Sequence, residues 1–230
     1  MTGHDLYLLS PQLAMVCVAV TVLVLDMIFR NKWVLFSSTL VGLLAPATLA
    51  LILWFNSPAN GDQVGLFGAL IVDKFSIFFQ LLFIVVAALV VLASVRYEQK
   101  MPGLRGEYVT LMLFSVTGMM LLSSTRELIS IYVALELTSL PIAALSAFLP
   151  NRKSVESGLK FLILSGISSA LLLYGMVYIY GFTGTTILSE IFENLQKMQS
   201  TGELDASIPF GSYALLFGIV IAISGFAFKI

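Results

Sequence analysis

Glu136 is the residue of this sequence best suited to proton chemistry, because it lies inside an apolar stretch from Leu128 to Leu149. About 20 apolar residues suffice to cross a bilayer as a helix, and an ionisable group at the centre of such a helix costs about 2.5–3.5 kcal/mol. A carboxylate in that position indicates proton or ion transfer and calls for a partner. Lys160 and Lys229 are the candidate partners. A static ion pair that only fixes helix packing is the alternative.

The helix around Glu136 presents small and hydroxyl-bearing residues on the same face. At helical offsets from the glutamate lie Tyr132, Ser139, Ala143 and Ser146. Such a face suits the interior of a helix bundle, where partner side chains or water can reach the carboxylate. Pro141 removes a backbone N–H from the same helix and predicts a kink just beyond Glu136.

Lys229 has two possible placements. It shares a helical face with small residues typical of close helix packing, which would direct it into the bundle; these are Gly211, Ala214, Gly218, Ala222 and Gly225. However, about 30 Å separate it from Pro209 along a straight helix. That distance favours a lysine whose ammonium reaches the far membrane surface. A core position requires a broken helix, for which Ser224-Gly225 is the candidate break.

Lys160 also has two interpretations. It follows Glu156 by four residues, the spacing of an ion pair along one helix at the membrane interface. It could equally lie near Glu136. Further along the same segment, the spacing of Ser165 and Ser169 is typical of a helix packing surface.

The composition indicates an all-α membrane protein that holds these residues on several spans. The chain is 59% hydrophobic and 11% charged, against about 25% charged residues in soluble proteins. A short amphipathic helix is also expected between residues 184 and 207. About seven transmembrane helices are predicted, at 11–29, 33–55, 74–95, 107–124, 128–149, 156–181 and 209–230.

Basic residues gather in alternate connections between these spans. The connections after the first, third and fifth spans contain Arg30, Lys32, Arg96, Lys100, Arg105, Arg152 and Lys153. Because basic loops stay in the cytoplasm, the pattern predicts an N-terminus outside the membrane.

Several functional classes are disfavoured by composition. A net charge of −1 gives no reason to expect nucleic acid as a partner. One cysteine and one histidine are too few for a disulfide framework or a Cys/His metal centre. No glycine-rich phosphate-binding motif is present. We therefore expect no cofactor or metal in this chain, no redox chemistry of its own and no soluble small-molecule substrate.

The stretch from residue 106 to 148 resembles the antiporter-like subunits of respiratory complex I, the proton-translocating NADH:quinone oxidoreductases. The resemblance continues through residues 154–186 and the final GFAFKI, and therefore spans essentially the whole chain. DKFSIFF in the third span and YLLSPQL near the N-terminus resemble the subunit N type more than its L and M relatives.

The resemblance implies the first half of a fourteen-helix fold built from two inverted five-helix repeats. Residues 1–106 would form the flanking helices and residues 107–230 the start of the first repeat, so the native chain would continue beyond Ile230. Glu136 would match the family's fifth-helix glutamate, Lys229 the lysine at the break of the seventh helix, and Lys160 a sixth-helix lysine near that pair. The resemblance thereby implies a mid-membrane position for Lys229.

By this resemblance the chain would be a membrane-arm subunit of complex I, a translocase in the bacterial plasma membrane. Its charge chain would move protons during quinone reduction, while other subunits bind NADH and quinone. Its partners would be the lipid bilayer and other membrane-arm subunits. The alternatives are a subunit of a cation/proton antiporter or membrane-bound hydrogenase with the same fold, or a non-conducting scaffold.

Overall fold

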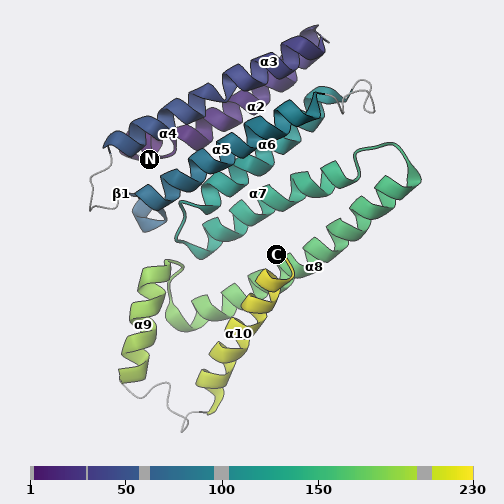
Figure 1. Ribbon diagram of the computed structural model, residues 1–230. Helices are drawn as coiled ribbons and strands as arrows, with labels where there is room; N and C mark the ends of the chain where they lie inside the picture. Colours follow the sequence, from purple (N-terminus) through teal and green to yellow (C-terminus); the bar gives the residue numbers. More distant parts are fainter. Residues whose placement is uncertain (1–2, 30, 57–62, 96–103, 201–208, 230) are drawn as a thin grey trace.

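The computed structural model describes residues 3–29, 31–56, 63–95, 104–200 and 209–229 (Figure 1). The chain is predominantly helical, and a short hairpin interrupts the helices. The helices are α1 (Gly3–Leu8), α2 (Ser10–Phe29), α3 (Lys32–Gly42), α4 (Leu44–Asn56), α5 (Lys74–Ser94), α6 (Arg105–Leu122), α7 (Leu128–Ser146), α8 (Arg152–Thr183), α9 (Leu188–Ser200) and α10 (Pro209–Ala227). The antiparallel hairpin consists of β1 (Gln63–Gly65), the 3-10 turn η1 (Leu66–Gly68) and β2 (Leu70–Val72).

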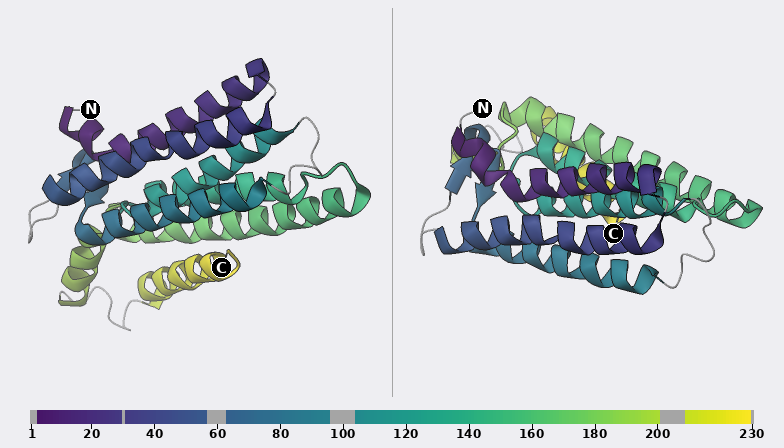
Figure 2. Two further views of the ribbon diagram at one scale, coloured as in Figure 1. Left: turned by 45° about the horizontal axis from the view of Figure 1, so that its top comes forward. Right: turned by 90° about the horizontal axis from the view of Figure 1, so that it is seen from above.

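The long helices pack side by side, and α6 lies within the bundle. Helix α6 contacts α2, α5 and α7, while α8 contacts α7 on one side and α10 on the other. Figures 1 and 2 show the resulting order, with α2 to α4 on one side of the bundle and α10 on the opposite side. Val109 and Leu113 of α6 are fully buried with Met15 of α2 and Val91 of α5. This apolar core holds α6 in place, and α7 packs on α6.

Five helical segments are long and apolar enough to cross a membrane, namely Ser10–Phe29, Trp33–Asn56, Lys74–Ser94, Leu128–Ser146 and Arg152–Thr183. They agree with five of the predicted spans. The predicted spans at 107–124 and 209–230 also form helices, α6 and α10, but these are not among the five. The count of seven transmembrane helices therefore stays a prediction.

Helix ends follow local capping chemistry. Asp73 and Ser76 form a reciprocal capping box at the start of α5. At the start of α8 the Asn151 side chain accepts a hydrogen bond from the Ser154 N–H at 2.8 Å. Helix α8 ends at Thr183 and is followed by Gly184, which adopts a positive φ of 72°. These signals set where α5 and α8 begin and where α8 ends.

Three connections meet at one end of the bundle. The hairpin pairs with the α6–α7 connection through Leu70 and Thr125, and that connection pairs with the α8–α9 connection through Glu127 and Ile187. This strand-like junction ties the beginning of α7 to the hairpin before α5 and to the end of α8. The sequence patterns predicted no strand here, because each pair joins segments far apart in the chain.

Two other predictions meet the structure differently. Helix α9 lies within the segment 184–207 where an amphipathic helix was expected, and the residues from 201 to 207 lie outside the described ranges. The orientation relied in part on Arg30, Arg96 and Lys100, which also lie outside the described ranges. The orientation stays a prediction.

Candidate functional site

The structure brings Glu136 and Lys229 into contact. Their atoms Oε1 and Nζ are 2.6 Å apart, although the residues are separated by 93 positions in the chain. The Lys229 side chain is 6% exposed and the Glu136 side chain 21% exposed. Glu136 lies near the middle of α7, so a largely buried ion pair occupies the interior of the helix bundle rather than its ends.

Ser169 of α8 is the third member of the site. Its hydroxyl donates a short hydrogen bond to Oε1 of Glu136, the same oxygen that contacts Lys229. The Ser169 Oγ also lies 2.8 Å from the carbonyl oxygen of Ser165. The sequence predicts Ser165 and Ser169 only as packing surface. The one available signal was a hydroxyl at mid-helix, and spacing alone does not reveal which neighbouring helix it faces.

Tyr132 lies one turn before Glu136 on the predicted polar face. The Lys229 Nζ is 5.9 Å from the centroid of the Tyr132 ring, within range of a cation–π interaction. The predicted face, which includes Tyr132 and Glu136, therefore does turn toward a charged partner, Lys229. One turn after the glutamate, the Ser139 Oγ is buried without a hydrogen-bond partner among the described residues.

Close packing between α8 and α10 determines the depth of Lys229. A Cβ atom added to Gly225 would lie 2.6 Å from the backbone nitrogen of Leu172, so the two helices nearly touch there. Close by, the Ser168 hydroxyl donates to the Gly225 carbonyl at 2.6 Å. Because Ser168 is at the middle of α8, residues near Gly225 lie level with the middle of α8 as well. Lys229 follows by one turn.

The alternative of a terminal lysine that reaches out of the helix bundle is therefore wrong, because the Lys229 side chain is buried against Glu136. Distance along α10 from Pro209 was a poor guide, because the register of α10 against α8 sets the depth of its far end. The predicted break at Ser224-Gly225 is also wrong, since α10 continues to Ala227. The chain then turns, with the Lys229 N–H donating to the Phe226 carbonyl at 2.9 Å, and this turn presents Lys229 to Glu136.

Helix α7 continues across Pro141 and ends at Ser146. The helix is thus not interrupted below Glu136. The Glu136 carboxylate therefore lies on the same continuous helix as Tyr132 and Ser139.

Lys160 lies apart from this site. Its Nζ is 2.7 Å from Oε1 of Glu156, and the side chains of the lysine and glutamate are 71% and 58% exposed. This contact confirms the ion pair expected from the four-residue spacing. Within the described ranges, no hydrogen bond or ion pair joins Lys160 to Glu136 or Lys229. A role for Lys160 in the same charge chain stays a prediction.

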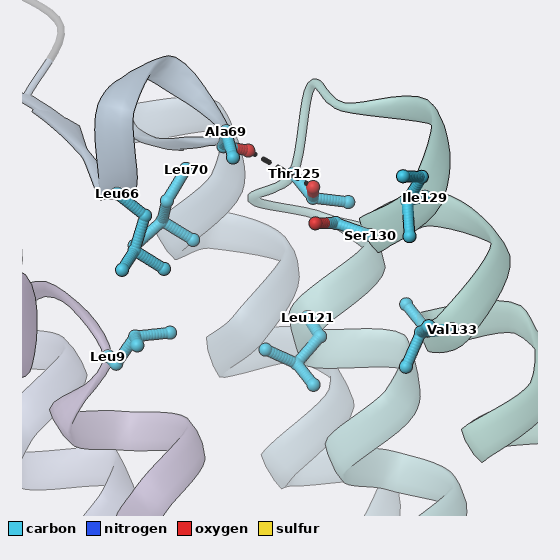
Figure 3. A pocket seen from close by; sticks show the side chains of 10 residues that line it. Leu9, Leu66, Ala69, Leu70, Leu121, Thr125, Ile129, Ser130 and Val133 are labelled. Carbon is cyan, nitrogen blue, oxygen red and sulfur yellow. Dashed lines mark hydrogen bonds between the residues drawn. The ribbon is translucent and has the colours of Figure 1, made fainter. Parts of the chain in front are cut away.

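A cavity of about 230 Å³ lies next to the junction of connections (Figure 3). Leu66, Leu70, Leu121 and Val133 are among its mainly apolar lining residues. Its polar groups include Thr125, whose hydroxyl donates to the Ala69 carbonyl at 3.1 Å. The lining contains no ionisable side chain, so this cavity is a weaker candidate for proton chemistry than the buried pair. Within the described ranges, no group of three or more His, Cys, Asp or Glu residues could hold a metal ion.

The chain is similar to known subunits of NADH-quinone oxidoreductases. The chain is 35% identical to NADH-quinone oxidoreductase subunit N of Dehalococcoides mccartyi, over 97% of this chain and 44% of that protein. It is 39% identical to the subunit N of Moorella thermoacetica, over 71% of this chain and 32% of that protein. The family model described as NADH:quinone oxidoreductase/Mrp antiporter, TM, matches residues 125–230. The chain is therefore similar to antiporter-like subunits along most of its length.

Solved structures show the antiporter-like fold independently. The chain resembles a chain of the membrane-bound sulfane sulfur reductase, an archaeal respiratory membrane complex, with a TM-score of 0.73 and 22% identity over 97% of this chain and 44% of that one. It resembles a chain of respiratory complex I from Thermus thermophilus with a TM-score of 0.63 and 24% identity over 94% and 52% of the two chains. The matched family and the apolar helices make this an integral membrane protein. The chain spans less than half the length of the subunit N relatives that it matches.

Proposed function

We propose that this chain is part of a membrane-arm subunit of a proton-translocating NADH:quinone oxidoreductase. In this proposal Glu136 and Lys229 exchange a proton during translocation. The observation that carries the proposal is the buried contact between these two residues, which are 2.6 Å apart and join α7 to the turn just beyond α10. A carboxylate and an amine inside a membrane bundle are costly, which supports a role in transfer rather than in packing alone.

The pair can carry a proton in two arrangements. In the charged arrangement the Glu136 carboxylate accepts a hydrogen bond from the Lys229 ammonium. Transfer of one proton breaks an N–H bond at Nζ and forms an O–H bond at Oε1, which leaves both groups neutral. Neither arrangement has a net charge, so both can remain buried.

The rest of the proposal concerns the whole complex. Residues 1–106 would form the flanking helices, and residues 107–230 would begin an antiporter-like repeat that the longer relatives complete. Lys160 would modulate the pair. Neighbouring membrane-arm subunits would be its partners, and NADH and quinone would bind to other subunits. The chain would lie in the bacterial plasma membrane with its N-terminus outside.

Glu136→Gln tests the proposal. The amide keeps the size of the side chain but cannot ionise, so we expect proton pumping per NADH oxidised to fall at least tenfold in membranes that contain the full-length subunit and its complex. Glu193→Gln, which neutralises an exposed carboxylate on α9, is the matched control and should pump normally. Wild-type pumping by Glu136→Gln, in complexes assembled to the normal level, would refute the role of Glu136.

A cation/proton antiporter is the second candidate, because the matching family model covers Mrp antiporters as well as quinone oxidoreductases. The two candidates differ in their energy source. Transport driven by NADH oxidation supports the first. Transport that needs only a cation gradient, in membranes without NADH, supports the second.

A further inference from the structure

The Ser169 hydroxyl lies between two hydrogen-bond acceptors. One is Oε1 of Glu136 on the neighbouring helix, and the other is the carbonyl of Ser165 at 2.8 Å on its own helix. A serine hydroxyl has one hydrogen and two lone pairs. It therefore donates to only one of these acceptors at a time, and it can accept a hydrogen bond while it donates to the other.

We infer that Ser169 is a positioning residue that reverses its hydrogen bond with Glu136 whenever Glu136 gains or loses a proton. The inference rests on the proposed function. When Glu136 is ionised, Ser169 donates to Oε1, together with the Lys229 ammonium. When the proton moves from Nζ to Oε1, an N–H bond breaks and an O–H bond forms. The new carboxylic O–H then rotates from Nζ to the Ser169 Oγ, the serine hydrogen rotates to the Ser165 carbonyl, and an N–H of the neutral Lys229 amine donates to Oε1.

This reversal keeps the Glu136 carboxyl group and the Ser169 hydroxyl hydrogen-bonded to each other in both states. Ser169 is only 6% exposed, so a hydroxyl or carboxyl left without a partner here would be destabilising. Rotations about the Ser169 Cβ–Oγ bond and the carboxyl C–O bond of Glu136 replace any movement of α7 against α8. The Ser169 hydroxyl thereby gives Glu136 a hydrogen bond in both protonation states. This similarity favours fast proton exchange between Glu136 and Lys229.

The adjacent Ser168 shows what a structural serine looks like in the same helix. It is 1% exposed, and its hydroxyl donates at 2.6 Å to the carbonyl of Gly225 on α10. A backbone carbonyl does not gain or lose a proton under these conditions, so this hydrogen bond has no second state. Ser168 joins two helices through a backbone carbonyl, whereas Ser169 contacts a carboxylate that can accept a proton.

Ser169→Ala, compared with Ser169→Thr, tests the inference. We expect the alanine variant to pump protons about tenfold more slowly per assembled complex, since it loses a hydrogen bond to an ionisable group. The threonine variant retains the hydroxyl and should recover pumping to within about threefold of the wild type. A rate that depends on the hydroxyl rather than on side-chain size is not expected from packing alone.

Infrared difference spectra supply a second readout. The carbonyl band of protonated Glu136, identified by its absence in Glu136→Gln, should shift to higher frequency in Ser169→Ala because its hydrogen bond is lost. Ser168→Ala, the matched control, should leave this band in place even if it lowers the amount of assembled complex. If Ser169→Ala does not assemble, Ser169→Cys keeps a similar volume with a weaker donor and should show the same shift in part.

The outcomes separate the two proposals. Normal pumping by Glu136→Gln would overturn the proposed function and this inference together. A defective Glu136→Gln combined with normal pumping and an unshifted band in Ser169→Ala would overturn the inference alone. Slow pumping and a shifted band in Ser169→Ala, both reversed in Ser169→Thr, would support it.

Discussion

Two glutamate–lysine pairs in this molecule have the same chemistry and almost the same distance between Nζ and Oε1, but they differ in their exposure to solvent. Glu136 and Lys229 are 2.6 Å apart with side chains 21% and 6% exposed, and Glu156 and Lys160 are 2.7 Å apart with side chains 58% and 71% exposed. The exposed pair joins neighbouring turns of α8. The buried pair joins α7 to the chain just beyond α10.

The comparison shows that the distance between the charged atoms of an ion pair does not indicate how much the pair contributes to stability. An exposed pair contributes about 0–1 kcal/mol, because solvent screens its charges. Removing one partner of a buried pair costs about 3–5 kcal/mol, because the other charge is left uncompensated. The buried pair also depends on the position of α10, whereas the exposed pair depends only on the local turn of α8. Only the buried pair can respond to helix movement.

Removing the buried ammonium should have the largest effect. Lys229→Met leaves Glu136 without its cationic partner, and we expect a loss of about 3–5 kcal/mol in stability together with loss of pumping. Thermal unfolding of the solubilised complex would measure the first effect and vesicle acidification the second. In the double variant Glu136→Gln with Lys229→Met, stability should largely return while pumping does not. If the double variant stays as unstable as the single one, the destabilisation is not due to an uncompensated charge.

The second-largest effect is expected from disturbing the packing of α10 on α8, which brings Lys229 to Glu136. A Cβ atom at Gly175 would lie 2.4 Å from the backbone nitrogen of Ala222, so Gly175→Ala forces α8 and α10 apart. We expect a cost of about 1–3 kcal/mol in unfolding free energy and reduced pumping. Gly166 on the same helix has no atom within 4 Å of its added Cβ. Gly166→Ala should thus be neutral or stabilising by up to about 1 kcal/mol, and equal losses in both variants would contradict the packing argument.

Mutation of the exposed Glu156–Lys160 pair should have the smallest effect. A double-mutant cycle with Glu156→Gln and Lys160→Gln should give a coupling energy of about 0.3–0.5 kcal/mol, as for other pairs four residues apart on an exposed helix surface. The coupling should fall further in high salt, because both side chains are open to solvent. A coupling above about 2 kcal/mol, independent of salt, would mean that this pair is buried in the assembled complex and resembles Glu136–Lys229 after all.

Features set by neighbouring residues could be predicted from the sequence. The apolar segments, the helix within 184–207 and the Glu156–Lys160 pair depend on helical periods of a few residues. Glu136 was identifiable because an ionisable residue inside an apolar run is conspicuous and costly wherever it lies in the fold. Family resemblance, rather than periodicity, was needed to expect Lys229 beside it.

Tertiary structure decided everything that joins distant segments. Counting along α10 predicted a membrane surface for Lys229, but the contacts of Gly225 with α8 place it beside Glu136. Ser169 could not be recognised as a partner of Glu136, since helical periodicity gives a face and not the neighbour that the face meets. The sequence by itself thus determined which residues are expensive to bury, and packing between helices determined which of them meet.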